Sequence, residues 1–407
     1  MKKVLCISLV LLLVLGGATA AFAANNSKTV AAAATTTTTT SSAVTTTETA
    51  VTIVPDMTFT GTPINLSLDN AYKKMLADSP GAKMAELNKQ SAYGVAQGYG
   101  ESVRAINKAE TNPASFWEYD NSNKDMLKYN RTFATVQGPK NYEAELNSLK
   151  SDTLKNYYTL KELENQEKIA KDNLALKEKL FTNTQLKFKL GTVSKNDVLK
   201  AEISVNEAKD QLIAATNGLN TMKMSFNQFI GYDLMQKVNL TDTIQEVSLS
   251  TKSLKDSIQD ALKNRNEMAE ATYNYDMAKL DFKNYDKYPS TSSKYIKAKM
   301  TMLLAETGYN SAPLTVENDV RTKYMAMNQK YSAIQTGKKS VENSKESVRL
   351  AQLQYDSGMA TLSDVEAAQL AYYNSQLDYS KALLEYNLAV NDYVLSSGVG
   401  ITTVTIK

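Results

Sequence analysis

The sequence predicts a mainly α-helical protein built from two tandem copies of an elongated antiparallel helical hairpin. Two stretches repeat each other at an offset of 167 residues, so that Gly191 and Asp197 reappear as Gly358 and Asp364. Each copy is typical of a long helix, a tight turn and a second long helix. About 50 residues per helix reach roughly 75 Å, which favours an elongated coiled-coil or tube-like object over a compact globule. The internal repeat therefore determines the expected architecture.

The order of elements is also expected to repeat. A short capped helix is predicted over 67–76, with a counterpart over 253–262 at an offset of 186 residues. Medium helices follow over about 82–108 and 267–286, and then a loop-like insertion in each copy. The long helices are predicted over roughly 139–190 and 315–357. Because the offset falls from 186 to 167, the first copy carries about 19 extra residues before its main hairpin.

The helices after the two turns carry a coiled-coil pattern. Residues with 3-4 spacing alternate between small and large side chains, which predicts knobs-into-holes packing with close approach at the alanines. In the second copy these residues are Val365, Ala368, Tyr372, Ser375, Tyr379, Ala382, Tyr386, Ala389 and Tyr393. In the first copy they are Val198, Ala201, Val205, Ala208, Leu212, Ala215, Leu219, Met222 and Phe226. A second seam at Leu370, Leu377 and Leu384 indicates neighbours on two sides, as in a closed wall of helices.

Both turns have the same two signals. Gly191 and Gly358 fit the left-handed position that follows the last residue of a helix. Ser194 with Asp197, and Thr361 with Asp364, form capping boxes at the start of the next helix. The aspartates can therefore be simple helix caps. In a symmetric assembly they could also form a ring of carboxylates that attracts cations at a constriction, and the two interpretations are compatible.

The composition excludes several classes of protein. The net charge of +3 is nearly balanced, so nucleic acid is not an expected partner. Histidine is absent, which removes the commonest general base and metal ligand. The single cysteine, Cys6, lies in a segment expected to be removed, so neither a disulfide nor a thiol nucleophile is expected. With no phosphate loop or metal cluster, the sequence predicts neither an enzyme nor a bound cofactor or metal.

The N-terminus reads as a secretory signal peptide over residues 1–23. Two lysines precede an apolar core of 12 residues, which is too short to span a bilayer, and Ala21-Phe22-Ala23 is a cleavage site. Ala18-Thr19-Ala20 is a weaker cleavage site, and an uncleaved anchor is the minor alternative. Residues 24–63 are rich in Thr and Ala, which predicts a disordered linker. The protein is thus expected to be exported, to the outer membrane or cell envelope.

The pattern resembles the TolC-like outer-membrane efflux protein family over roughly residues 64–400. The resemblance rests on the start signal Ile64-Asn-Leu-Ser-Leu-Asp-Asn-Ala71, repeated in weaker form around Ser253-Leu254. It also rests on the duplicated turn motif, which is Leu186…Phe188…Gly191…Asp197-Val198…Ala201 in the first copy and Leu353…Tyr355…Gly358…Asp364-Val365…Ala368 in the second. The two repeats are assigned to residues 64–235 and 248–400.

This resemblance implies a homotrimeric duct whose helices form a hollow α-barrel. The turns would form its entrance and dock onto a periplasmic adaptor protein and an inner-membrane pump. The family places an aspartate of the second turn at the constriction, and Asp364 matches that position. A second family acid is replaced here by Ala367, so the acidic ring would be thinner.

The two insertions depart from the family, which uses each of them for two membrane-spanning strands. Transmembrane strands need about ten residues of alternating polarity. Only Thr132–Val136 and Ile296–Met302 are weak strand candidates, and the second could equally be helical. Little or no β-barrel is therefore expected. The sequence favours a passive trimeric efflux or export duct, and the alternative is a barrel-less structural or adaptor-like coiled-coil protein of the envelope.

Overall fold

The computed structural model describes residues 58–111, 123–247 and 252–406. The predicted signal peptide and most of the predicted linker lie outside these residues. Within the described part the chain is almost entirely helical, with a single two-stranded sheet. The described helices include none with the length and apolar character needed to cross a membrane.

The first repeat contains two strands and four helices. The strands are β1 (Thr60–Leu66) and β2 (Gln236–Leu240), and they pair in parallel. The helices are α1 (Leu68–Asp78), α2 (Pro80–Glu110), α3 (Lys124–Lys189) and α4 (Lys195–Ile230). Strand β1 begins at Thr60, a few residues inside the segment 24–63 that is predicted as linker. The strand is fixed there because Leu66 and Leu240 are paired in register and buried.

The second repeat has the same order of helices. It consists of α5 (Leu254–Asn264), α6 (Asn266–Tyr285), α7 (Ser293–Asp356) and α8 (Leu362–Ser396). Helices α1 and α5 both have 11 residues and begin after a serine whose hydroxyl accepts a backbone N–H. The expected helical duplication is therefore confirmed. Most of the extra length of the first repeat lies in α2, which has 31 residues against 20 in α6.

The described residues of the two insertions include long helical segments, and both predicted strand candidates are helical. The strand candidate Thr132–Val136 lies inside α3, and Ile296–Met302 lies inside α7. The long helices were predicted to begin at about residues 139 and 315, close to Pro139 and Pro313, and proline usually occupies the first turn of a helix. Both prolines instead lie inside continuous helices of 66 and 64 residues, each roughly 100 Å long. The insertions thus extend the predicted hairpins at the end remote from the turns.

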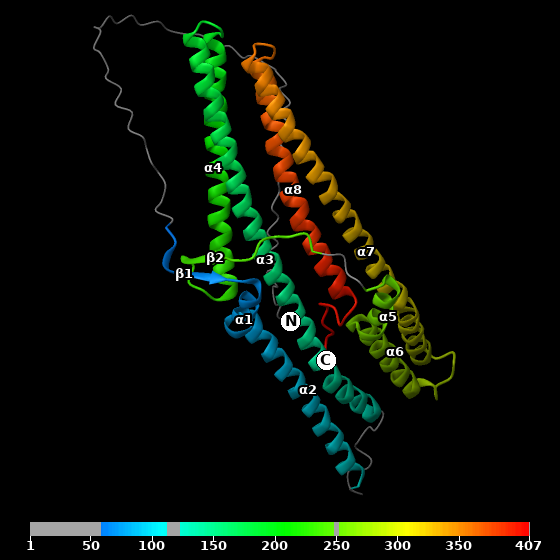
Figure 1. Cartoon of the computed structure of the whole chain (residues 1–407). Helices are drawn as coiled ribbons and strands as arrows, with labels where there is room; N and C mark the ends of the chain where they lie inside the picture. The colour runs from blue at the N-terminus through cyan, green and yellow to red at the C-terminus, as the bar shows by residue number, and fades with distance from the viewer. Residues whose placement is uncertain (1–57, 112–122, 248–251, 407) are drawn as a thin grey trace, which may run out of the picture. The chain divides into compact units, whose positions relative to one another are not determined.

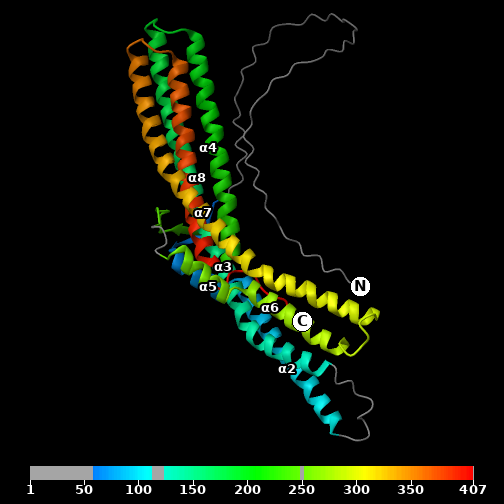
Figure 2. The same cartoon turned by 90° about the vertical axis from the view of Figure 1, so that its right-hand side faces the viewer.

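The long helices lie side by side in a layer one helix thick (Figures 1 and 2). Towards the Gly191 and Gly358 turns the order is α7, α8, α3, α4, and towards the other end it is α2, α3, α6, α7. Helices α3 and α7 therefore run through both halves. Three buried clusters hold the layer together. One lies within the first repeat around Tyr157 and Phe226, one within the second around Tyr386 and Tyr393, and the third joins the repeats near the turns.

The two seams predicted for α8 lie mostly inside the layer. In α8, Val365, Tyr386 and Tyr393 are almost fully buried, and the remaining seam residues are at least half-buried. Of the second predicted seam, Leu377 and Leu384 are half-buried whereas Leu370 is exposed. Helix α8 therefore does pack against neighbours on two sides, namely α7 and α3, along most of its length.

A buried polar network fastens the C-terminal segment between the repeats. The side-chain amide of Gln137 in α3 donates to the carbonyl oxygens of Asn141 and Asn266 at 2.9 and 2.8 Å. Asn266 at the start of α6 is fully buried and donates to the carbonyl of Thr402 at 2.8 Å. Asn141 exchanges two hydrogen bonds with the backbone of Val404. This network joins α3, α6 and the tail at one point.

An adjacent ionic cluster surrounds Arg265, between α5 and α6. Its guanidinium bonds the carboxylates of Glu267 and Asp319. Burial raises the pKa of the Asp319 carboxyl, but hydrogen bonds from Arg265 and Lys323 outweigh burial and leave the pKa below its ordinary value. The same balance between burial and hydrogen bonds from Arg265 lowers the pKa of Glu267.

Candidate functional site: the paired turns and the helices behind them

The two turns have the same backbone structure. After α3, the N–H of Gly191 donates to the carbonyl of Phe188 and the N–H of Thr192 to that of Lys187. After α7, Gly358 and Met359 donate to the equivalent carbonyls at 3.1 and 2.8 Å. These are paired Schellman bonds, and the glycines have φ of 75° and 76°. Both glycines are open to solvent, so it is the left-handed backbone that favours glycine.

Each aspartate is engaged inside its own turn. One carboxylate oxygen of Asp364 accepts the backbone N–H of Thr361 at 2.8 Å and its hydroxyl at 2.7 Å. Asp197 makes the same two contacts with Ser194 at 3.0 and 2.8 Å. These hydrogen bonds hold the pKa of the exposed Asp364 carboxyl below its ordinary value. The predicted capping boxes are confirmed, and the contacts of the two aspartates do not join one turn to the other.

The turns are instead joined by Lys187 and Tyr355. The Lys187 ammonium donates to the main-chain carbonyl of Tyr355 at 2.5 Å and lies 3.8 Å from the centre of its ring. It is also 3.9 Å from Asp356. The Thr184 hydroxyl donates to the carbonyl of Leu180 and lies 3.2 Å from the Tyr355 hydroxyl, which is therefore placed to donate to it. We name Lys187, Thr184 and Tyr355 the turn lock.

The turn lock encloses a small apolar cluster. Its buried members are Leu180, Ala201, Tyr355, Leu362 and Val365, which come from all four long helices. Lys187 gives the Tyr355 carbonyl a second hydrogen bond beside that from the Gly358 N–H, at the C-terminal end of α7, where the helix favours positive charge. The lock therefore holds the end of α3 against the end of α7.

Behind the turns, the layer carries a cavity on each face of α3. The larger, of about 660 Å³, lies between α3 and α7 over Tyr372 of α8. The smaller, of about 250 Å³, is lined by Lys177, Glu207 and Glu366. Burial lowers the pKa of the Lys177 ammonium, which the two glutamates oppose. The Ser204 hydroxyl donates to Glu366 at 2.5 Å and so links α4 to α8.

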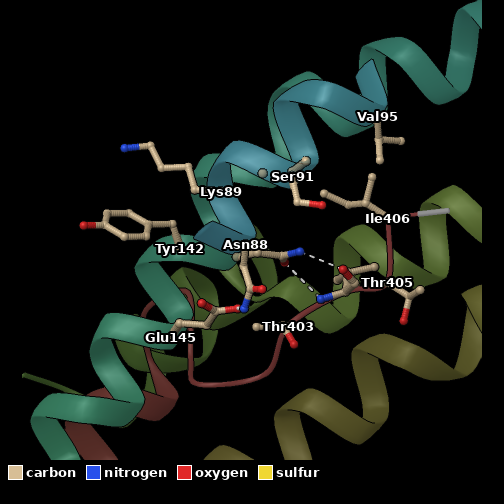
Figure 3. A pocket seen from close by; sticks show the side chains of 13 residues that line it. Asn88, Lys89, Ser91, Val95, Tyr142, Glu145, Thr403, Thr405 and Ile406 are labelled. Carbon is tan, nitrogen blue, oxygen red and sulfur yellow. Dashed lines mark hydrogen bonds between the residues drawn. The ribbon is translucent and has the colours of Figure 1, made fainter. Parts of the chain in front are cut away.

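A third cavity, of about 230 Å³, lies beside the C-terminal tail (Figure 3). The figure shows Ile406 of the tail facing Ser91 and Val95 of α2. Two of the polar side chains that line the cavity are paired, since Asn88 donates to Glu145 at 3.0 Å and Asn141 donates to the Val404 carbonyl at 2.7 Å. No cluster of three or more acidic, histidine or cysteine ligands occurs among the described residues. We therefore treat this cavity as a gap beside the tail.

Sequence reasoning identified the turns but missed the lock. Tyr355 belongs to the quoted turn motif, where it was an unexplained aromatic position. Lys187 was not singled out, because its counterpart at the equivalent position of the second repeat is Gln354 and duplication gave no signal for it. The difference between Lys187 and Gln354 at equivalent positions of the repeat is the signal that could have identified Lys187.

Comparison with known proteins supports the resemblance. A model of the family "Outer membrane efflux protein" matches residues 286–398, which include all of α7 and α8. No curated protein sequence matches the chain.

Among solved structures, the fold is similar to the outer membrane protein VceC of Vibrio cholerae (TM-score 0.64, 14% identity, covering 82% of this chain and 97% of VceC). It is also similar to the CmeC outer membrane channel of Campylobacter jejuni (TM-score 0.64, 13% identity, 82% and 86% covered). A third similar structure is CusC (TM-score 0.64, 12% identity, 84% and 94% covered).

At these low identities the solved structures show similarity of fold alone. The family model shows similarity of sequence within the second repeat. The solved structures cover more than four fifths of this chain and so share the fold of both repeats. In fold, and in the sequence of its second repeat, this chain resembles the TolC-like outer-membrane efflux proteins.

Proposed function

We propose that the chain is one subunit of a passive export duct of the cell envelope, closed by copies of itself. The observation that carries the proposal is the layer one helix thick, whose two long edges, α4 and α7, carry exposed apolar side chains. These are Leu199, Ile203 and Ile213 on α4, and Met325, Leu350 and Leu353 on α7, exposed by between 44% and 61%. Two different edges that bind each other head to tail generate a ring when the rotation closes.

Three copies would complete the ring, as the family resemblance implies. The Gly191 and Gly358 turns would then gather at one end and form its entrance. Asp364 would supply one carboxylate per copy at that entrance, with Ala367 replacing the second acid. The exposed helix ends would dock to a periplasmic adaptor and an inner-membrane pump, and transport would need no catalytic group in this chain.

Opening would require the turns of one copy to part. The turn lock is the contact that must break, because Lys187 and Thr184 hold α3 to Tyr355 of α7. Asp364 remains bound within its own turn when this happens. We therefore assign the lock to the closed state and the aspartate to cation attraction at the opening.

The test is the mass of the protein purified from the envelope, with and without detergent. The duct predicts a trimer that dissociates when the double substitution Leu199→Glu and Ile203→Glu places charge on the α4 edge. A matched substitution of two lysines on that helix, Lys200→Glu and Lys209→Glu, should leave the trimer intact. A monomer in every condition would overturn the duct.

A second candidate is a structural or adaptor-like coiled-coil protein of the envelope. It is favoured by one specific observation: the segments 124–138 and 293–314, where the family has strands, are helical. It predicts that Asp364→Ala changes no permeability, whereas the duct predicts altered cation leak at the entrance. Ion flux through vesicles containing the purified protein separates the two candidates.

A further inference from the structure

The first three turns of α7 present an apolar stripe to solvent. The stripe consists of Ile296, Met300, Leu303 and Leu304, which are exposed by 48%, 52%, 39% and 69%. Their spacing of four, three and one residues puts them on one face of the helix. This stripe lies at the end of α7 remote from the Gly358 turn, roughly 80 Å away along the helix.

The opposite face of the same segment is packed against α6. Ala298 is buried, the ring of Tyr295 contacts that of Phe282 at 5.3 Å, and the ring of Tyr309 stacks on that of Tyr275 at 5.4 Å. Aromatic pairing therefore fixes the rotation of α7 about its axis. The stripe is held outward as part of a rigid two-helix hairpin and is not a loose helix end.

The surroundings of the stripe are basic. Residues 287–305 contain no acidic residue and four lysines, which are Lys287, Lys294, Lys297 and Lys299. All four are exposed. On the facing end of α6, Lys279 and Lys283 stand among Asp276, Asp281 and Asp286, so the hairpin end as a whole keeps a positive charge.

The tyrosines complete the pattern. Lys294 lies 5.4 Å from the ring centre of Tyr288, and Lys299 lies 5.8 Å from that of Tyr295. Tyrosine and lysine side chains with an apolar body and a polar tip are favoured where water meets hydrocarbon. An exposed apolar stripe, flanking lysines and adjacent tyrosines together are the features of a helix that lies in a membrane interface.

We propose that the α6–α7 hairpin end binds the surface of an anionic lipid membrane, with Ile296, Met300, Leu303 and Leu304 entering the boundary between headgroups and acyl chains. The flanking lysines would contact lipid phosphates. Such binding is peripheral, and it does not depend on the proposed duct, since a single copy carries the whole surface.

A second copy of the chain is the competing occupant. The layer's other edge at this level is α2, which would face the stripe in a ring. Its charges are mixed: Lys83, Lys89, Arg104 and Lys108 stand against Glu86, Glu101 and Glu110. Helix α2 therefore offers no acidic surface that would complement the four lysines around the stripe. Anionic lipid headgroups would complement them. The charge pattern favours the membrane.

The test is co-sedimentation of the full chain with vesicles of phosphatidylcholine, with or without phosphatidylglycerol. We expect binding to the anionic vesicles that weakens as salt is raised. Replacing Lys294, Lys297 and Lys299 by Gln should weaken it about a hundredfold. Replacing Met300 and Leu304 by Ser should weaken it at least about tenfold. All variants share the same N-terminal segment, so any contribution from that segment cancels.

The control replaces exposed lysines elsewhere, Lys195, Lys200 and Lys209 of α4, by Gln and should leave vesicle binding unchanged. Insertion is read separately from the fluorescence of Leu304→Trp in a Trp117→Phe background, which has no other tryptophan. A blue shift with anionic vesicles supports the proposal. Equal vesicle binding by the stripe variants and the control overturns the proposal. Loss of self-association in the stripe variants with unchanged vesicle binding also overturns it, and assigns the stripe to a contact with a second copy.

Discussion

The substitution Lys187→Ala tests whether the turn lock holds the two hairpins together. It removes one ammonium that bonds the Tyr355 carbonyl, lies over the Tyr355 ring and neighbours Asp356. It leaves the Gly191 and Gly358 turns and both capping boxes intact, because Lys187 contributes only its backbone to them. The predicted consequence is therefore a local one, confined to the ends of α3 and α7.

The expected cost follows from the three contacts. A hydrogen bond from a charged donor contributes about 1.5–3 kcal/mol, and a partly exposed cation–π contact about 0.5–1 kcal/mol. The ion pair to Asp356 at 3.9 Å is half-exposed and adds about 0–1 kcal/mol. The closed arrangement should thus lose about 2–5 kcal/mol, which shifts the ratio of closed to parted turns by roughly 30- to 4,000-fold.

Native-state hydrogen exchange detects the loss at the amides of Gly358 and Met359, because the end of α7 opens locally more often once Lys187 no longer holds the Tyr355 carbonyl and ring. Their exchange should accelerate by up to that factor in Lys187→Ala, and by less in Tyr355→Phe, which keeps the ring and loses only a hydroxyl. The control is Lys189→Ala, which changes an exposed lysine two residues away. Identical exchange in Lys187→Ala and Lys189→Ala would refute the lock.

Three further predictions concern the parts that hold the layer. Asn266→Ala should cost about 2–4 kcal/mol in urea unfolding, because it removes a partner of the buried Gln137 amide and of the Thr402 carbonyl. An unchanged unfolding midpoint would contradict this. Gly358→Ala should lower the free energy of unfolding by about 1–2 kcal/mol, because Gly358 has a positive φ. An alanine variant as stable as the parent would contradict this explanation. The pKa of Asp319 is lowered in the folded state, so the stability that Asp319 contributes is complete above about pH 4 and is lost as pH falls further. The melting temperature of Asp319→Asn should therefore fall less steeply than that of the parent between about pH 5 and 2.

The duplicated turns could be predicted from the sequence because short-range chemistry determines them. A glycine in the left-handed region and a hydroxyl–aspartate capping box both act within six residues, and both recur in each repeat. The seams could be predicted for a related reason, since periodicity records which face of a helix is covered. Leu370 was the exception, because spacing alone cannot show where a neighbouring helix diverges.

The insertions could not be predicted in the same way. Alternation at Ile296–Met302 is also compatible with a helix, and the choice is decided by Ala298 and Tyr295 packing on α6, which are tertiary contacts. Pro139 and Pro313 lie inside α3 and α7, because each costs a helix only one backbone hydrogen bond and some crowding, which neighbouring packing offsets. The lock was equally out of reach, because Lys187 and Tyr355 are 168 positions apart and the repeat replaces them by residues of other types, Gln354 and Phe188.

The repeat also predicts a contact between copies. Tyr355 and Phe188 occupy equivalent positions, but Tyr355 is 3% exposed and Phe188 is 44% exposed, because only Tyr355 is covered by the other repeat of the same chain. In a ring of quasi-equivalent hairpins, Phe188 would be covered in the same way by the residue that corresponds to Lys187, which is Gln354 of the next copy.

The double substitution Phe188→Cys and Gln354→Cys tests this geometry, because the only native cysteine, Cys6, lies in the predicted signal peptide. Each copy would be linked to the next around the ring, so mild oxidation should produce covalent trimers that reducing agent dissolves. Either cysteine alone should give no species larger than a dimer. If the double variant stays monomeric while the protein is trimeric by mass, the two halves of the entrance are not quasi-equivalent. The lock would then be a feature of one chain and not the repeating contact of the ring.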